Sequence, residues 1–177
     1  MAQQNPEAQD IQLLRRAGHG DSKAFHELLD RHAQRLYRLA MSLVDNAADA
    51  EDVVQETFIG AYRGLQSFRE QSSVKTWLTR ILFTQAALMQ RNRRRRANAV
   101  LDESVVGSMA DPDSGIDVQA ALRKLSPEYR EILMLREFEQ MSYAEIAEVL
   151  NVPQGTVESR LHRARGELRE KLKAYLT

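Results

Sequence analysis

Apolar side chains recur every three or four positions along most of the chain, which is the spacing of an amphipathic α-helix. One stripe begins after Asp21, a second after Asn46 and a third at Val74. Asp21 and Asn46 are residue types that cap helix N-termini, so the first two stripes predict long helices, packed antiparallel. A shorter helix over residues 10–17 is expected to precede them.

The most specific local pattern lies between Ser142 and Arg165. Ser142 followed three residues later by Glu145 predicts a capping box at the start of a helix. The segment Asn151-Val152-Pro153-Gln154 ends that helix, and apolar positions at helical spacing resume after Gly155. Two short helices joined by a sharp turn are a helix-turn-helix, the motif that places its second helix in the DNA major groove.

The whole chain is predicted to be all-α. It contains only 8 Gly and 4 Pro and lacks the alternating β-branched runs that build sheets. We expect two small helical domains, residues 1–96 and residues 119–177. The second is a four-helix domain that carries the helix-turn-helix and is braced by a helix opening at Ser126-Pro127-Glu128. Residues 97–118 lose the helical period and gather Asp, Ser, Gly and Pro, so they are predicted to form a flexible acidic linker.

Charge is strongly segregated along this sequence, although the formal net charge is zero. Residues 1–96 hold 15 Lys and Arg against 11 Asp and Glu, and residues 97–118 hold none against 5. Residues 119–177 hold 10 against 9. Local potential rather than total charge attracts a polyanion, so a neutral total is compatible with nucleic-acid binding.

Several classes of protein are not supported by the composition. The chain has no cysteine, which leaves no disulfide framework and no thiolate metal site. Its apolar runs are too short for a membrane span or a signal peptide, so we expect a cytoplasmic protein without membrane insertion of its own. His32 has no second ligand at metal-binding spacing and is interpreted as a satisfied core histidine, so no metal is expected.

One face of the second long helix is acidic. Asp49, Asp52 and Glu56 share that face, with Gln55 beside them. Two interpretations are open from the residues alone: favourable charge near a helix N-terminus, or a docking surface for a basic partner. No nucleophile, glycine-rich phosphate loop or convergent histidine accompanies the carboxylates, so the chain is not expected to be an enzyme or to hold a cofactor.

The third long helix becomes basic toward its end. Lys75 and Arg80 lie on its outer side, and it runs into the segment Arg91-Asn-Arg-Arg-Arg-Arg96. Arginines at a helix C-terminus complement the helix dipole, but five in six residues exceed that need. The run indicates a patch that follows phosphates.

The second helix of the helix-turn-helix is polar and cationic on its outer face. Arginines there can contact guanine edges or phosphates, whereas the alternative interpretation is a solvated surface helix. The residues expected to face DNA are Thr156, Glu158, Ser159, Arg160, His162, Arg163 and Arg165.

The order of these parts resembles an extracytoplasmic-function (group IV) RNA polymerase sigma factor, from about residue 10 onward. The segments that carry the resemblance are Gly20-Asp21-x-x-Ala24-Phe25, the stretch from Asn46 to Phe58, Ser67-Phe68-Arg69, Lys75-Thr76-Trp77-Leu78 with Arg80-Ile81, Leu125-Ser126-Pro127, and the stretch from Gly155 to Arg165. A generic DNA-binding regulator would share only the last.

The resemblance implies a non-catalytic subunit that binds core RNA polymerase, recognises promoter DNA and answers to an anti-sigma factor. It favours docking on polymerase as the role of Asp49, Asp52, Gln55 and Glu56. Residues 1–96 would recognise and melt the minus-ten element, whose contacts are expected from Phe68, Lys75, Trp77, Arg80, Thr84, Arg91, Arg93 and Arg94. Residues 119–177 would read the minus-35 element through the seven helix-turn-helix positions named above.

The chain departs from the family pattern after Ile81. The family usually has a small residue, then an asparagine and a later polar residue, whereas this chain has Leu82, Phe83, Thr84 and later Leu88. Thr84 offers one hydroxyl where the family usually has the two-point amide of asparagine. This departure keeps one alternative open, a sigma-like decoy that sequesters an anti-sigma factor. A stand-alone helix-turn-helix regulator is a second alternative, which would bind its operator tightly without polymerase.

Overall fold

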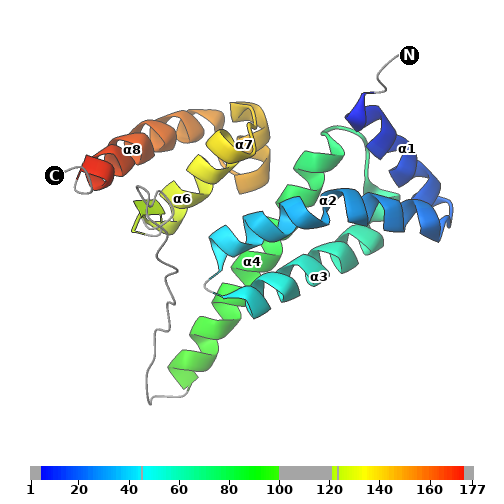
Figure 1. Ribbon diagram of the computed structural model, residues 1–177, viewed down its shortest axis with the longest axis horizontal. Coiled ribbons are helices and arrows are strands. Elements are labelled where there is room, and N and C mark those ends of the chain that lie inside the picture. Colours follow the sequence, from blue (N-terminus) through cyan, green and yellow to red (C-terminus); the bar gives the residue numbers. More distant parts are fainter. Residues whose placement is uncertain (1–4, 45, 100–120, 123, 174–177) are drawn as a thin grey trace. The chain divides into compact units, whose positions relative to one another are not determined.

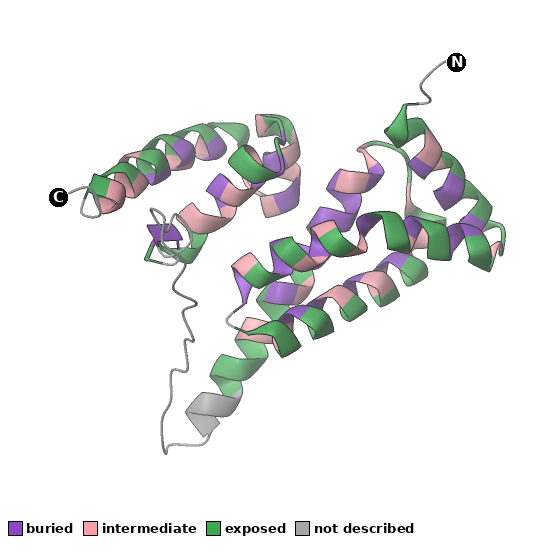
Figure 2. Ribbon diagram, viewed as in Figure 1, coloured by how far each residue is buried: buried purple, intermediate pink, exposed green. Residues whose placement is uncertain are grey.

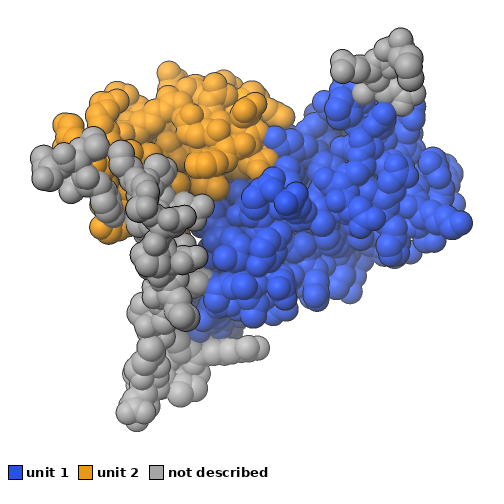
Figure 3. All heavy atoms as spheres, in the orientation of Figure 1, with its two compact units in different colours: residues 1–97 blue, residues 98–177 orange. Residues whose placement is uncertain are grey.

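The computed structural model describes residues 5–44, 46–99, 121–122 and 124–173, with the backbone alone for residues 96–99. The chain divides into two compact units, Met1–Ala97 and Asn98–Thr177, which we call the N-terminal and C-terminal units (Figure 3). Across the described ranges the secondary structure is helical, without a strand, so the predicted all-α class is confirmed. No helix in these ranges is both long and apolar enough to cross a membrane.

Side-chain caps set the starts of the first three helices. α1 covers Pro6–Gly18, α2 covers Ser22–Leu43 and α3 covers Ala47–Gly64. The Asp21 carboxylate accepts a hydrogen bond from the Ala24 amide, and the Asn46 side chain accepts one from the Asp49 amide, as predicted. The first helix begins before residue 10, because Asn5 caps it and proline at its first position favours helical entry.

The fourth helix begins at a serine cap and runs past the predicted domain boundary. A short 3-10 turn, η1 (Leu65–Ser67), leads from α3 into a loop that ends at Ser73, whose hydroxyl accepts from the Thr76 amide. α4 then covers Val74–Ala99, so the helix continues three residues into the segment predicted as a linker. Alanines at 97 and 99 are strong helix formers, and neither Gly nor Pro interrupts the helix there. The rest of the predicted linker lies outside the described residues.

The core of the N-terminal unit lies where α2, α3 and α4 face one another. α2 and α3 run antiparallel, as expected, and the buried positions form inward stripes on the helices (Figures 1 and 2). The largest fully buried side chains are Leu28, Leu36 and Leu39 of α2, Val53 of α3, and Leu78 and Leu82 of α4. Burial of each leucine stabilises the fold by about 1.5–3 kcal/mol relative to exposure.

Two glycines allow α3 to approach α4 closely. A methyl group at Gly60 would lie 3.1 Å from Ile81 Cγ2, and one at Gly64 would lie 3.3 Å from Trp77 Cζ2. Both distances are tighter than ordinary van der Waals contact. The packing of α3 against the start of α4 therefore depends on small residues at these positions.

A buried polar contact joins α1 to α2. The His32 ring nitrogen Nε2 lies 2.8 Å from Asp10 Oδ2, and both side chains are buried. Arg31 approaches the other Asp10 oxygen at 3.3 Å. His32 is thus a satisfied core histidine, as interpreted, and no group of three or more candidate metal ligands occurs among the described residues.

The C-terminal unit contains the predicted helix-turn-helix. Its described elements are α6 (Pro127–Leu133), a π-helical turn η2 (Met134–Phe138), α7 (Tyr143–Leu150) and α8 (Gln154–Lys173) (Figure 1). Residues 121 and 122, ahead of α6, are also helical. The remainder of the expected fourth helix lies outside the described ranges.

Local signals for this unit are largely confirmed. Ser142 and Glu145 form the predicted capping box, and Asn151 ends α7 in a left-handed conformation, with a φ of 51°. α8 opens one residue earlier than expected, at Gln154. Ser126 occupies the N-cap position of α6, but its side chain makes no capping hydrogen bond.

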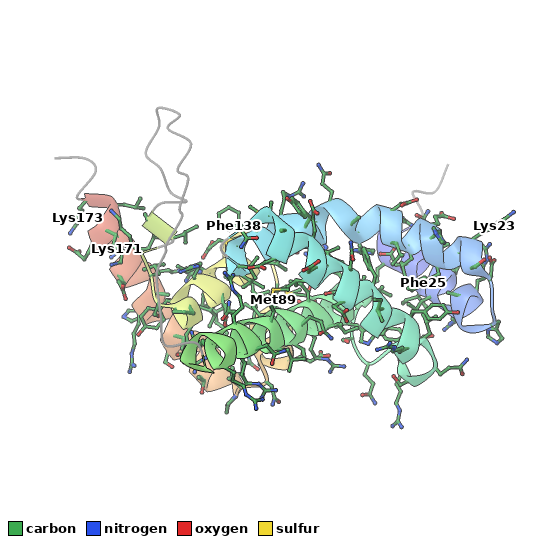
Figure 4. The ribbon with its side chains drawn as sticks, turned by 90° about the horizontal axis from the view of Figure 1, so that it is seen from below. Lys23, Phe25, Met89, Phe138, Lys171 and Lys173 are labelled. Carbon is green, nitrogen blue, oxygen red and sulfur yellow. The ribbon has the colours of Figure 1, made fainter. Side chains whose placement is uncertain are left out.

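One apolar residue of this unit lies where the sequence pattern did not place it. Phe138 follows the buried Leu135 by three positions, which is helical spacing, yet it is 58% exposed (labelled in Figure 4). The Glu139 amide donates to the Met134 carbonyl, five residues earlier. A π-helical turn inserts one extra residue and rotates the positions after it, which carries Phe138 off the buried stripe.

Candidate functional sites

Three of the four predicted acidic-face residues of α3 are open to solvent. Asp52, Gln55 and Glu56 are exposed, whereas Asp49 is half-buried. The Asp49 carboxylate accepts a hydrogen bond from the Asn46 side chain at 2.9 Å and forms an ion pair with Arg93 of α4. Asp49 is therefore already engaged within the N-terminal unit, and the freely presented charge lies at Asp52 and Glu56.

The same face of α3 continues into two exposed apolar side chains. Ile59 follows Glu56 by three positions and is 41% exposed, and Tyr62 is 62% exposed. The Tyr62 ring makes a T-shaped contact with Phe25, with 5.2 Å between ring centroids and 62° between the ring planes (Phe25 is labelled in Figure 4). Helical spacing from Asp52 would have found Ile59. We call the exposed set Asp52, Gln55, Glu56 and Ile59 the α3 face.

The basic end of α4 is exposed, as its composition indicated. Arg91, Arg93 and Arg94 are all at the surface. Arg93 pairs with Asp49, so the structure joins two residues that the sequence assigned to different sites. The other two remain open to solvent and extend the positive surface of the helix.

The aromatic pair near the start of α4 has one accessible member. Phe68 is half-buried, and its ring packs against Trp77 at 5.1 Å between centroids and an angle of 55°. Trp77 itself is only 5% exposed, because it lies against α3 at Gly64. Phe68 therefore packs on a buried indole, which supports its ring on the side facing the core.

The remaining predicted minus-ten residues lie along α4. Arg80 and Thr84 are exposed and Lys75 is half-buried. The Thr84 hydroxyl donates to the Arg80 carbonyl at 2.9 Å, so its hydrogen atom is used by its own helix while its lone pairs remain outward. Leu88, one turn further, is 36% exposed.

α8 presents the expected polar face. Val157, Leu161 and Ala164 are buried against the rest of the C-terminal unit. The predicted DNA-facing positions divide into half-buried and exposed ones. Thr156 and Arg160 are half-buried, and the exposed ones are Glu158, Ser159, His162, Arg163 and Arg165.

Two of the three arginines on this face are held by carboxylates. The Arg165 guanidinium donates to Glu137 at 2.7 Å, a hydrogen bond that raises the pKa of Arg165. Arg160 lies 3.4 Å from Glu128 of α6. Arg163 makes no hydrogen bond or ion pair with any described residue, so its five donors are available to a ligand.

A further carboxylate of the C-terminal unit lies close enough to Arg160 of α8 to feel its charge. Glu131 of α6 is half-buried, and its pKa is raised by burial and by the neighbouring charge of Glu128. The cations Arg130 and Arg160 oppose that shift. Sequence reasoning did not single out Glu131, because its partial burial depends on tertiary packing and not on its neighbours along the chain.

Each unit matches one known sequence family. Residues 28–97 match the family described as Sigma-70 region 2, and residues 116–168 match the family described as Sigma-70, region 4. The chain is 32% identical to the ECF RNA polymerase sigma factor SigW of Bacillus subtilis, over 87% of this chain and 91% of that protein. It is 36% identical to the RNA polymerase sigma-H factor of Pseudomonas aeruginosa, over 95% and 96% of the two chains.

Two solved structures are similar over most of the chain. CnrH in complex with the cytosolic domain of CnrY superimposes with a TM-score of 0.72 at 30% identity, covering 94% of this chain and 98% of that one. The sigma factor RpoE of Bartonella quintana, in complex with the anti-sigma factor NepR, gives 0.71 at 34% identity, covering 85% and 98%.

Proposed function

Because the chain belongs to the extracytoplasmic-function family of RNA polymerase sigma factors, it directs promoter recognition in transcription initiation, and we propose how its parts divide that work. Residues 1–96 dock on core polymerase and recognise and melt the minus-ten element. Residues 97–118 link the two domains, and residues 119–177 read the minus-35 element. The observation that carries this division is that the two compact units match sigma-70 regions 2 and 4, in that order.

We assign polymerase docking to the α3 face, with Asp49 at its edge. Asp52, Gln55 and Glu56 offer carboxylates and an amide to a basic surface, and Ile59 adds apolar area beside them. Interfaces gain most from a buried apolar centre with charges around it, which this face supplies. Asp49 is paired with Arg93, so it would contribute to docking as part of that ion pair.

Minus-ten recognition is assigned to Phe68 and the outer side of α4. An unstacked base needs an apolar wall, and Phe68, supported by Trp77, offers one. Lys75 and Arg80 lie on α4, two and three positions from Trp77 along the chain, and Thr84 offers its hydroxyl oxygen as an acceptor. The arginines at 91, 93 and 94 would follow the phosphates.

Minus-35 recognition is assigned to α8, with Arg163 as its principal contact. Arg160 and Arg165 are oriented by Glu128 and Glu137, so they suit phosphates or bases at fixed positions. Thr156, Glu158, Ser159 and His162 complete the surface.

We further propose that the chain binds an anti-sigma factor and acts in the cytoplasm, where core polymerase works. Support comes from the two similar structures, each of a complex with a protein partner. The relatives are sigma factors, which are not enzymes, and we assign no catalytic chemistry to this chain.

Transcription from a promoter library with the full chain and core polymerase tests the proposal. We expect specific initiation that requires both proteins. Initiation from no promoter would overturn it. Capture of an anti-sigma protein without salt-dependent duplex binding would favour the decoy, and tight operator binding without polymerase would favour the stand-alone regulator.

Substituting Arg163→Ala tests the assignment of α8. If Arg163 contacts a base, discrimination at one minus-35 position should fall by about 1–3 kcal/mol; if it contacts a phosphate, all sequences should weaken alike and the salt slope should fall by about one unit. Binding measured over a salt series distinguishes the two. Unchanged affinity for every sequence would show that another face of α8 meets the DNA.

A further inference from the structure

The loop between α3 and α4 is tied to α1 on both sides of Phe68. Before it, Gln66 donates from its side-chain nitrogen to the Gly18 carbonyl, at the end of α1, at 3.0 Å. After it, Glu70 receives two hydrogen bonds from Arg15, one from Nε and one from Nη2, each 2.7 Å long. These contacts join parts of the chain that are far apart in sequence.

Glu70 holds an unfavourable backbone conformation at this contact. Its φ is 55°, in the left-handed region that a residue with a side chain adopts at a cost of about 1–2 kcal/mol. No turn type demands glutamate there, and glycine would fit the backbone better. What glutamate adds is the carboxylate that accepts both hydrogen bonds from Arg15, and these bonds lower the pKa of Glu70.

The geometry of the pair suits positioning. Two parallel N–H···O bonds between a guanidinium and a carboxylate fix direction as well as distance. The pair is largely exposed, with 63% of the Arg15 side chain and 37% of the Glu70 side chain open to solvent, so its effect on global stability should be small. We therefore expect loss of the ion pair to change the orientation of the loop that carries Phe68 more than it changes the stability of the fold.

We propose that Arg15 of α1 is a positioning residue for promoter opening: through Glu70 it holds the loop so that Phe68 presents its ring to an extruded minus-ten base. This inference rests on the minus-ten role proposed above for Phe68. It adds α1, which carries none of the assigned DNA contacts, to the parts that set minus-ten specificity. Arg15 itself touches no DNA in this mechanism.

The neighbouring residue provides a matched control. Arg16 forms an ion pair with Asp21 at 2.7 Å, and the exposures of the two side chains, 58% and 35%, are close to those of Arg15 and Glu70. That pair joins the end of α1 to the start of α2 and does not involve the loop. Arg16→Ala therefore removes an equivalent surface ion pair without releasing Glu70.

The test uses holoenzyme assembled from the full chain and core polymerase, and a promoter selected from a library by the wild-type holoenzyme. Two single-stranded oligonucleotides are compared, one with the selected minus-ten non-template sequence and one with a single base of it replaced. The discrimination ratio is the affinity for the selected strand divided by the affinity for the altered strand. We expect Arg15→Ala to lower this ratio by about two- to fivefold, the range that an exposed ion pair produces. Affinity for core polymerase and for minus-35 duplex should not change.

Two further variants separate positioning from general damage. Glu70→Gly relieves the left-handed backbone but removes the carboxylate, so it should narrow the ratio as Arg15→Ala does. The double variant Arg15→Glu with Glu70→Arg restores an ion pair of reversed direction, so it should recover part of the lost discrimination between the two strands. A destabilised fold would instead lower both affinities together and leave their ratio unchanged.

The inference is overturned if Arg15→Ala discriminates as well as the wild type, or if Arg16→Ala narrows the ratio equally. If the wild-type holoenzyme itself does not discriminate between the two strands, the minus-ten assignment of Phe68 is wrong and the role of Arg15 falls with it. Discrimination by the wild type that survives in Arg15→Ala rejects only the positioning role.

Discussion

Three non-glycine residues in the described part of the chain have a left-handed backbone, and each stands at a junction. Asn151, with a φ of 51°, joins α7 to α8, Gln140 precedes α7, and Glu70 precedes α4, the last two with a φ of 55°. Asparagine tolerates this conformation well, so Asn151 could be anticipated from sequence. Glutamine and glutamate are not typical there, and only the folded chain shows that they adopt it.

Gly166, in contrast, lies within α8 at a position where neither the backbone conformation nor the packing requires glycine. A methyl group there would meet nothing within 4 Å. We expect Gly166→Ala to raise the free energy of unfolding of the free chain by about 0.5–1 kcal/mol, because alanine loses less backbone freedom on folding. Urea denaturation measures this. Gly20→Ala is the control with the opposite sign, since Gly20 has a φ of 94°; a loss of stability in Gly166→Ala would show an unfavourable contact on that face.

Glu131 should make stability depend on pH. Its pKa is raised above the ordinary 4.5, mainly by burial. The folded chain therefore holds this proton more tightly than the unfolded chain, a contribution present below pH 4.5 and lost as the pH rises through the raised pKa. We expect Glu131→Gln to be more stable than the wild type at neutral pH, with the difference shrinking on acidification. Lower stability of the variant at neutral pH would show that attraction to Arg130 and Arg160 outweighs burial.

At the scale of the element, helix ends are decided within one turn. A serine, aspartate or asparagine side chain reaches amides two or three residues ahead whatever the rest of the chain does, so Asp21, Asn46, Ser73 and Ser142 could all be read as caps. Ser126 shows the limit of this reasoning. It has the right residue type and position, yet its side chain does not form the bond.

This difference predicts unequal effects of two similar substitutions. Ser142→Ala should lower the free energy of unfolding by about 0.5–2 kcal/mol, because it removes one half of the capping box with Glu145. Ser126→Ala should change it by less than about 0.5 kcal/mol, the usual range for a surface substitution without such a feature. Thermal or urea unfolding of the full chain compares them. Equal losses would mean that Ser126 caps α6 in solution.

At the scale of the whole molecule, opposite charges are concentrated on different elements. The α3 face is acidic, whereas the end of α4 and the outer side of α8 are cationic. A charged surface attracts a partner of opposite charge and repels a partner of the same charge. A chain of zero net charge can therefore address a basic protein surface and a polyanion through separate faces.

Reversing charge on the α3 face should separate these partners. We expect Asp52→Lys with Glu56→Lys to weaken binding to core polymerase by roughly tenfold or more, since like charges are then brought together. Binding of minus-35 duplex by the free chain should not fall. The control is Glu27→Lys with Asp30→Lys, which reverses two exposed acids of α2. Equal loss in the control would indicate a general charge effect, and no loss in either would place polymerase docking elsewhere.

The sequence by itself determined what depends on neighbours along the chain. Helical periodicity, caps, the turn at Asn151 and the charge of each helix face follow from residues within a few positions of one another. The motif order that identified the family is likewise linear. For these reasons the all-α fold, the helix-turn-helix and the exposure of most of the proposed site residues were predictable.

Only the tertiary structure decided which of those residues are already engaged. Arg93 meets Asp49 across 44 positions, Arg165 meets Glu137 across 28, and Arg15 meets Glu70 across 55. Such pairs depend on which helix faces pack together, and helix packing likewise buries Trp77 and partly buries Glu131. A sequence specifies the charge of a side chain, but whether that charge remains available to a partner is set by what another helix brings within a few ångströms of it.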